Sequence, residues 1–108
     1  ADRFRFDAVA ESTPLAADRI TDFVFAAGDR IVLSLIDANS FAPADQAFAF
    51  IGAAAFGGAG AASAGQLRVT LNAPGQWRAQ GDVNGDGVAD LQIDIVSATA
   101  PVAGWFLL

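Results

Sequence analysis

Hydrophobic and polar residues alternate along several short segments of the chain, which is the period of a half-buried β-strand. The segments predicted as strands on this pattern are 3–9, 19–25, 30–36, 47–52, 66–71, 76–80 and 91–96. The alternation in 19–25 is imperfect, so that strand is expected to carry a bend or bulge near Asp22. The sequence therefore predicts a mainly β fold.

The segments between these strands have the composition of turns and loops. Residues 72–75, Asn-Ala-Pro-Gly, predict a tight turn that joins two strands as a hairpin. Residues 36–46 predict a loop in which one helical turn begins near Pro43. Residues 52–65 are almost wholly Ala, Gly and Ser, and fit either a short helix around 53–56 or a flexible connector.

The length of 108 residues fits one hydrophobic core, so residues 1–108 are predicted to form a single module. Although 54% of the residues are hydrophobic, many of these are alanines, and no run approaches the roughly 18 apolar residues of a membrane helix. The chain begins with charged residues at alternate positions instead of a basic region followed by an apolar stretch. We therefore expect neither membrane insertion nor a cleavable signal peptide.

The charged residues of the chain indicate which chemical class of partner it binds. The acidic residues are eleven aspartates and one glutamate, the basic residues are six arginines, and the net charge is −6. Phosphate-rich partners require clustered Lys and Arg, so nucleic acid and anionic lipid are disfavoured and divalent cations are favoured. The chain has no Cys and no His, which removes disulfides, thiolate metal sites and the usual zinc chemistry. The alternative is that the acidic residues simply keep the surface solvated.

The strongest candidate site is the sequence DVNGDGVAD at residues 82–90. Oxygen-bearing side chains stand at its first, third, fifth and ninth positions, glycine stands at the sixth, and the seventh offers a backbone carbonyl. Alternate oxygens of this kind converge on one calcium ion in calcium-binding loops, and the glycine permits the sharp turn. The predicted calcium ligands are Asp82, Asn84, Asp86, the carbonyl of Val88, and Asp90.

The match to an EF-hand is confined to the loop. The twelfth position holds Ile93 in place of the usual bidentate glutamate, and no helix pattern flanks the turn. Asp94 is the nearest downstream carboxylate, although strand alternation directs it outward. The simpler alternative is an ordinary Asn-Gly or Asp-Gly hairpin turn, which needs only one oxygen-bearing side chain.

The order of several motifs resembles the C-terminal region of serralysin-type RTX proteins. The segments that carry the resemblance are DRFRF, DRITDF, GDRIVLSLIDAN, AFAFIG, GQLRV and GDVNGDGVADLQI, which together span nearly the whole chain. The resemblance implies a β-roll end or β-sandwich-like cap with short loops and at most one or two short helices. In this family, calcium-binding repeats stack as a parallel β-roll, and such a region caps the roll.

The resemblance also implies further ligands and partners. Asp2 with Phe4 resembles the end of a last calcium repeat, and Asp18 and Asp22 resemble carboxylates that close the final site of the roll, with Asp29 a weaker candidate. The implied partners are an upstream domain of the same polypeptide and a type I secretion apparatus, and the implied location is extracellular. The family's peptidases bind zinc through histidines, so protease activity is expected in a parent protein and not in this chain.

Two other function classes stay open on sequence grounds. The chain could be an independent extracellular binding, adhesion or inhibitor module, or a hydrolase that uses an aspartate pair. The apolar tail at residues 105–108 has two possible roles, packing on the β-core and recognition by the export machinery.

Overall fold

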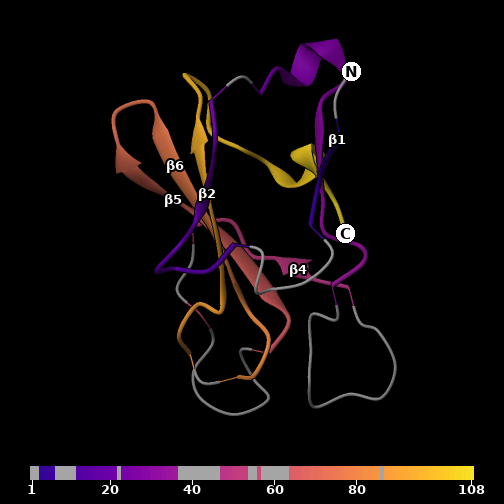
Figure 1. Cartoon of the computed structure of the whole chain (residues 1–108), viewed down its shortest axis with the longest axis vertical. Helices are drawn as coiled ribbons and strands as arrows, with labels where there is room; N and C mark the ends of the chain where they lie inside the picture. Colours follow the sequence, from indigo (N-terminus) through magenta and orange to yellow (C-terminus); the bar gives the residue numbers. More distant parts are fainter. Residues whose placement is uncertain are drawn as a thin grey trace.

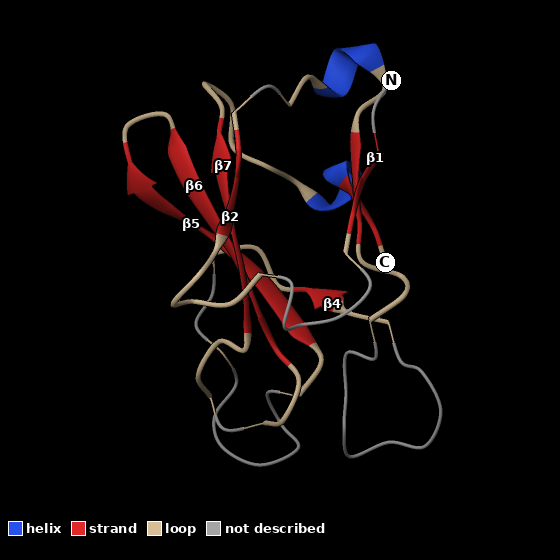
Figure 2. Ribbon diagram, in the orientation of Figure 1, coloured by secondary structure: helices blue, strands red, loops and turns tan. Residues whose placement is uncertain are grey.

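The computed structural model is mainly β and contains two sheets (Figure 2). It describes residues 3–6, 12–21, 23–36, 47–53, 56, 64–85 and 87–108. Within these residues it contains no α-helix, and the helical elements are two 3-10 turns, η2 (Phe25–Ala27) and η4 (Ala103–Trp105). No helix of the described residues is long and apolar enough to cross a membrane. The mainly β fold expected from the alternation is confirmed.

The smaller sheet has three parallel strands in the order β1-β3-β8, and the larger has five strands in the order β2-β7-β6-β5-β4 (Figure 1). The strands are β1 (Arg3–Arg5), β2 (Asp18–Ile20), β3 (Arg30–Val32), β4 (Ala49–Phe50), β5 (Gln66–Ala73), β6 (Gln76–Asp82), β7 (Leu91–Val96) and β8 (Phe106–Leu107).

The first three strands alternate between the two sheets. β1 lies in the smaller sheet, β2 in the larger, and β3 returns to pair parallel with β1, with Phe4 opposite Ile31. β2 pairs parallel with β7. A chain that alternates between two facing sheets and pairs parallel with its own earlier strand makes one coil of a roll.

The larger sheet is built around the antiparallel strands β5, β6 and β7. β5 and β6 form the predicted hairpin, whose turn contains Pro74 and Gly75, with Gly75 at a φ of 72°. β7 has the predicted bounds of 91–96, and Leu91 lies opposite Gly81 of β6. These three strands carry the candidate aspartate turn at one end of the sheet.

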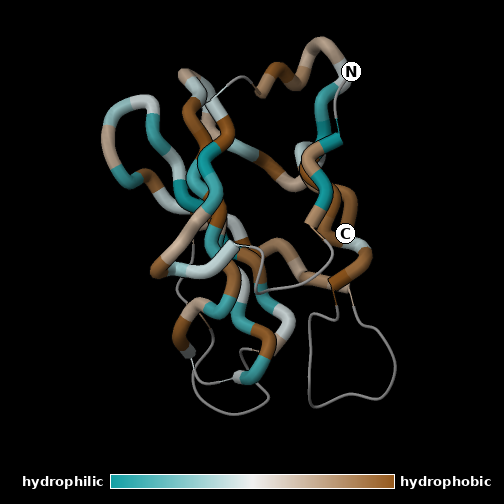
Figure 3. The backbone as a smooth tube through the Cα atoms, in the orientation of Figure 1, coloured by the Kyte–Doolittle hydropathy of each residue, from teal (hydrophilic) through white to brown (hydrophobic). Residues whose placement is uncertain are grey.

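Both sheets turn their apolar residues toward a common core. β1 alternates between hydrophilic and hydrophobic residues, whereas β2 has two hydrophilic residues before the buried Ile20 (Figure 3). The core includes Ile31 of the smaller sheet and Ile93 and Ile95 of the larger, all fully buried. The rings of Phe50 and Phe106 lie 5.9 Å apart and join β4 to β8.

Several expectations for the strands need correction. The predicted strand 3–9 ends at Arg5, and the predicted strand 47–52 is confined to Ala49–Phe50. The predicted strand 19–25 ends at Ile20, and Phe25 lies in a 3-10 turn. The predicted strand 30–36 ends at Val32, and Leu35 is 47% exposed because the chain turns after Leu33. The strand 91–96 is not the last one, since the tail adds β8.

Other expectations lie partly or wholly outside the described residues. These are the end of the first predicted strand at 7–9, the bulge near Asp22, the helical turn near Pro43, and most of the segment 52–65.

Candidate functional site

The aspartate turn at residues 82–90 connects β6 to β7 at one end of the larger sheet. Gly81 and Leu91 are paired across the two strands, and the amide of Asp90 donates to the carbonyl oxygen of Gly81 at 2.8 Å. Asp82 and Asp90 therefore leave neighbouring strands side by side, one at the start of the turn and one at its end.

Asp82 is fully buried and organises the middle of the turn. Its Oδ1 accepts a hydrogen bond from the amide of Gly85 at 2.8 Å, and its Oδ2 accepts one from the amide of Gly87 at 2.9 Å. Both glycines have positive φ angles, 73° and 76°, which other residues adopt only with strain. The carboxylate and the two glycines together determine the path of the chain.

From the other end of the turn, Asp90 accepts hydrogen bonds from backbone amides. Its Oδ2 accepts hydrogen bonds from the amides of Val83 at 3.0 Å and Asn84 at 3.4 Å. The two carboxylates thus reach into the turn from opposite ends, and each binds backbone amides that would otherwise need another acceptor. Both aspartates therefore support the shape of the turn through hydrogen bonds to its backbone.

The other predicted ligands of the turn differ in their placement. Asn84 is exposed and Val88 is 63% exposed. Asp86, the predicted ligand at the fifth position, lies outside the described residues. Among the residues that are described, no group of three or more acidic, His or Cys side chains is arranged to hold a metal ion.

The donor chemistry of the turn suits a hard cation. Its side chains and carbonyls offer oxygen only, which is the ligand type that calcium takes. The two oxygens of a carboxylate offer about four lone-pair sites, so a carboxylate can accept amide hydrogen bonds and bind an ion at the same time. The amide bonds made by Asp82 and Asp90 are compatible with a cation on the same carboxylates.

Asp94 does not contribute to the turn. Its Oδ1 lies 3.4 Å from Nε of Arg78 and 3.5 Å from Nε2 of Gln92, on the outward side of the larger sheet. The outward direction predicted from strand alternation is confirmed, and it removes Asp94 as a candidate for the missing downstream ligand.

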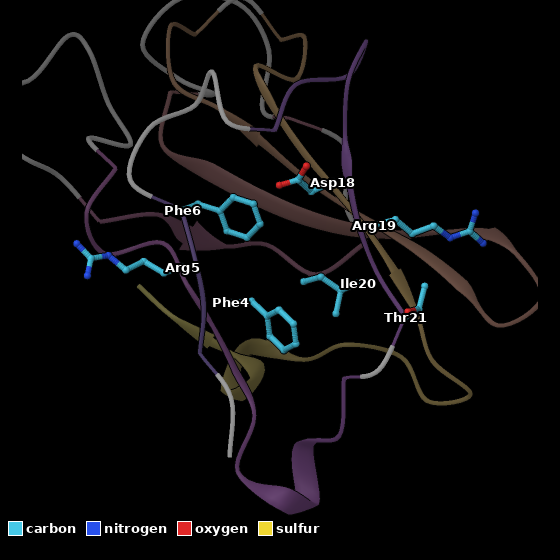
Figure 4. A pocket seen from close by; sticks show the side chains of 7 residues that line it. All are labelled: Phe4, Arg5, Phe6, Asp18, Arg19, Ile20 and Thr21. Atoms are coloured by element: carbon cyan, nitrogen blue, oxygen red, sulfur yellow. The ribbon is translucent and has the colours of Figure 1, made fainter.

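The N-terminal aspartates are only partly within the described residues. Asp2 and Asp22 lie outside them. Asp18 begins β2, is exposed, and lines a cavity of about 360 Å³ together with Phe6 and Ile20 (Figure 4). Asp29 is buried and accepts a hydrogen bond from the amide of Val24 at 3.0 Å, so it supports the turn around η2.

Ser12 connects the two candidate regions, and the sequence analysis did not single it out. It is fully buried, its hydroxyl donates to the carbonyl oxygen of Gln92, and the same oxygen accepts from the amide of Asp18 at 2.8 Å. The amide of Gln92 donates to the carbonyl of Ser12 at 3.0 Å. A serine in a polar loop gives no local signal of such a role, because the role depends on a strand 80 residues away.

Comparison with known proteins adds no family to this picture. No protein-family model matches the chain, and a search of curated proteins finds no significant match. The resemblance to serralysin-type RTX proteins therefore rests on the motifs of the sequence itself.

Proposed function

We propose that this chain is a non-catalytic, calcium-binding module that caps the end of a parallel β-roll and supports the export and extracellular folding of an upstream domain. The observation that carries the calcium assignment is the convergence of Asp82 and Asp90 on one turn whose remaining donors are oxygens. Its spacing matches a calcium loop over nine positions.

The role as a cap is supported by the arrangement of β1 and β2. Each is the outermost described strand of its sheet. The cavity of about 360 Å³ lies between them, and Phe4, Phe6 and Ile20 point into it while Arg5 and Arg19 point away (Figure 4). An edge strand presents backbone groups to which another strand can be added. A preceding coil would extend both sheets in parallel and cover Phe4, which is partly exposed, while Phe6 and Ile20 are already buried.

Calcium connects this role to export. Extracellular calcium sites have dissociation constants of roughly 10⁻⁴ to 10⁻³ M, so millimolar calcium outside the cell fills them and cytosolic calcium does not. Binding to the native state alone stabilises folding. The module would remain weakly folded before passage through a type I secretion apparatus and become stable outside the cell.

The chemistry of any parent protein belongs to its upstream domain. The chain contains no His and no Cys, so it lacks the common nucleophile and general-base pairs. The parent would supply a serralysin-type metalloprotease domain or another secreted hydrolase.

Calorimetric titration of the chain with calcium and with magnesium tests the proposal. We expect saturable calcium binding and much weaker magnesium binding, because the smaller ion demands a stricter octahedral geometry. Asp90→Asn should weaken calcium binding at least about tenfold, which corresponds to about 1.4 kcal/mol. Asp94→Asn is the matched control, since it removes a carboxylate from the outward face only. Equal calcium affinity in the wild type and in Asp90→Asn would contradict the assignment.

A further inference from the structure

Asn84 and Gly85 form a pair that is chemically capable of deamidation. We propose that Asn84 is a site of spontaneous deamidation and that the folded turn suppresses the reaction through Asp82. The amide nitrogen of Gly85 attacks Cγ of Asn84, and glycine has no side chain to hinder this approach. The proposal gives Asn84, which is also a predicted calcium ligand, a second chemical property.

The reaction consumes only water. The Gly85 nitrogen loses its proton to solvent and forms a bond to Cγ, the bond from Cγ to Nδ2 breaks, and the departing nitrogen takes protons from water and leaves as ammonia. Water then opens the cyclic imide at either carbonyl. The product at position 84 is aspartate or isoaspartate, with one additional negative charge.

The native turn opposes the first step. The Gly85 amide donates to Oδ1 of Asp82 at 2.8 Å, and both residues are buried. Negative charge on the nitrogen would develop beside a carboxylate, which is unfavourable at this distance. Solvent base also cannot reach the proton until the hydrogen bond opens. Because a hydrogen bond to an ionised acceptor is among the stronger ones, such opening is infrequent.

The later steps of the reaction require access of solvent to Asn84. Asn84 is exposed, so water is available to open the imide and ammonia can leave. The consequence for calcium rests on the proposed function. An aspartate at position 84 adds a charged ligand, whereas isoaspartate lengthens the backbone by one carbon and moves the later ligands out of their spacing.

Peptide mass spectrometry of the full chain tests the proposal, with the chain incubated in chelator at mildly alkaline pH and at a temperature at which circular dichroism shows the calcium-free chain to be folded. Asn72 is an internal control, because it is also exposed and is followed by Ala73. In urea, Asn84 should convert to the acid faster than Asn72. In the folded chain, conversion of Asn84 should be at least about tenfold slower than in urea. Equal conversion of the two asparagines in urea, or equal rates for Asn84 in folded and unfolded chain, would overturn the proposal.

A variant tests the part assigned to Asp82. Asp82→Asn keeps an oxygen acceptor and removes the charge, so folded-state conversion of Asn84 should accelerate, while Asp94→Asn should leave it unchanged. Circular dichroism verifies that both variants are folded. An unchanged rate in folded Asp82→Asn would contradict the role of the carboxylate. Since all these measurements are made without calcium, a failure here is distinct from a failure of calcium binding.

Discussion

Trp105 stacks on Phe23, with ring centroids 4.5 Å apart and an interplanar angle of 25°. The contact joins the tail of the chain to the segment that follows β2. Phe106 is also buried, and the amide of Leu33 donates to the carbonyl of Leu107 at 2.9 Å, which extends the pairing of β3 with β8. Of the two roles considered for the apolar tail, packing on the core is therefore observed.

Removal of the Trp105 ring should destabilise the folded chain substantially. Trp105→Ala is expected to lower the free energy of unfolding by about 3–5 kcal/mol, the usual range for a buried large aromatic residue. Val102→Ala is the matched control, because Val102 is 53% exposed and should change stability by less than about 0.5 kcal/mol. Urea denaturation measures both. A wild-type midpoint for Trp105→Ala would contradict the packing role.

A role of the apolar tail in export is a separate prediction. If residues 105–108 are read by a type I apparatus, their deletion should abolish secretion from a competent host. The folded chain buries Trp105 and Phe106, so the signal would be accessible only before folding. The amount of secreted protein, compared with total expression, gives the answer, and undiminished secretion would exclude the tail from recognition.

Gly81 is predicted to be intolerant of any side chain. A Cβ at this position would lie 2.7 Å from Cε1 of Phe48, which is itself buried. Gly81→Ala should therefore reduce the free energy of unfolding by about 1–3 kcal/mol through overpacking. Gly104→Ala is the control, since its Cβ would meet Phe25 at an ordinary 3.8 Å. Addition of Phe48→Leu to Gly81→Ala should recover part of the loss, and a full loss in the double variant would rule out overpacking.

Ser12 should stabilise the edge strand β2. Ser12→Ala leaves the buried Gln92 carbonyl and the Asp18 amide without their hydroxyl partner, which costs about 1–3 kcal/mol. Ser97→Ala removes only an exposed hydrogen bond from the amide of Thr99 and is expected to be nearly neutral. Hydrogen exchange should show faster exchange of the Asp18 amide in Ser12→Ala, and unchanged protection there would refute the role.

The sequence predicted those parts of the fold that depend on local pattern. Residues 91–95 alternate and lie in β7, and the turn at 72–75 closes the predicted hairpin. The failures have long-range causes. Leu35 continues the alternation of β3, yet the chain turns away after Leu33, and β8 has too few residues to give a periodic signal.

For the candidate site, too, the sequence predicted what depends on local spacing and missed what depends on the folded path of the chain. The spacing of Asp82 and Asp90 predicted a shared turn, because nine residues between two paired strands bring their side chains together. The spacing did not reveal that both carboxylates bind backbone amides, since a hydrogen bond within the turn depends on the path of the chain. The hydrogen bonds of the Ser12 hydroxyl require the pairing of β2 with β7, which no local pattern specifies.

Calcium should raise the thermal stability of the chain. Ion binding to the native state stabilises it by about 2.7 kcal/mol when the free ion is at one hundred times its dissociation constant. Differential scanning calorimetry in calcium and in chelator should show melting temperatures several degrees apart, and the difference should shrink in Asp90→Asn. Identical melting temperatures of the wild type in calcium and in chelator would contradict a role for calcium in folding.

The most direct test of the central claim is a high-resolution crystal structure grown in millimolar calcium, with the ion identified by anomalous scattering. We expect one calcium ion in the turn 82–90, with oxygens at about 2.3–2.6 Å. The expected ligands are Asp82, Asn84, Asp86, the carbonyl of Val88, and Asp90. A turn without an ion, in which Asp82 and Asp90 bind backbone amides only, would contradict the claim.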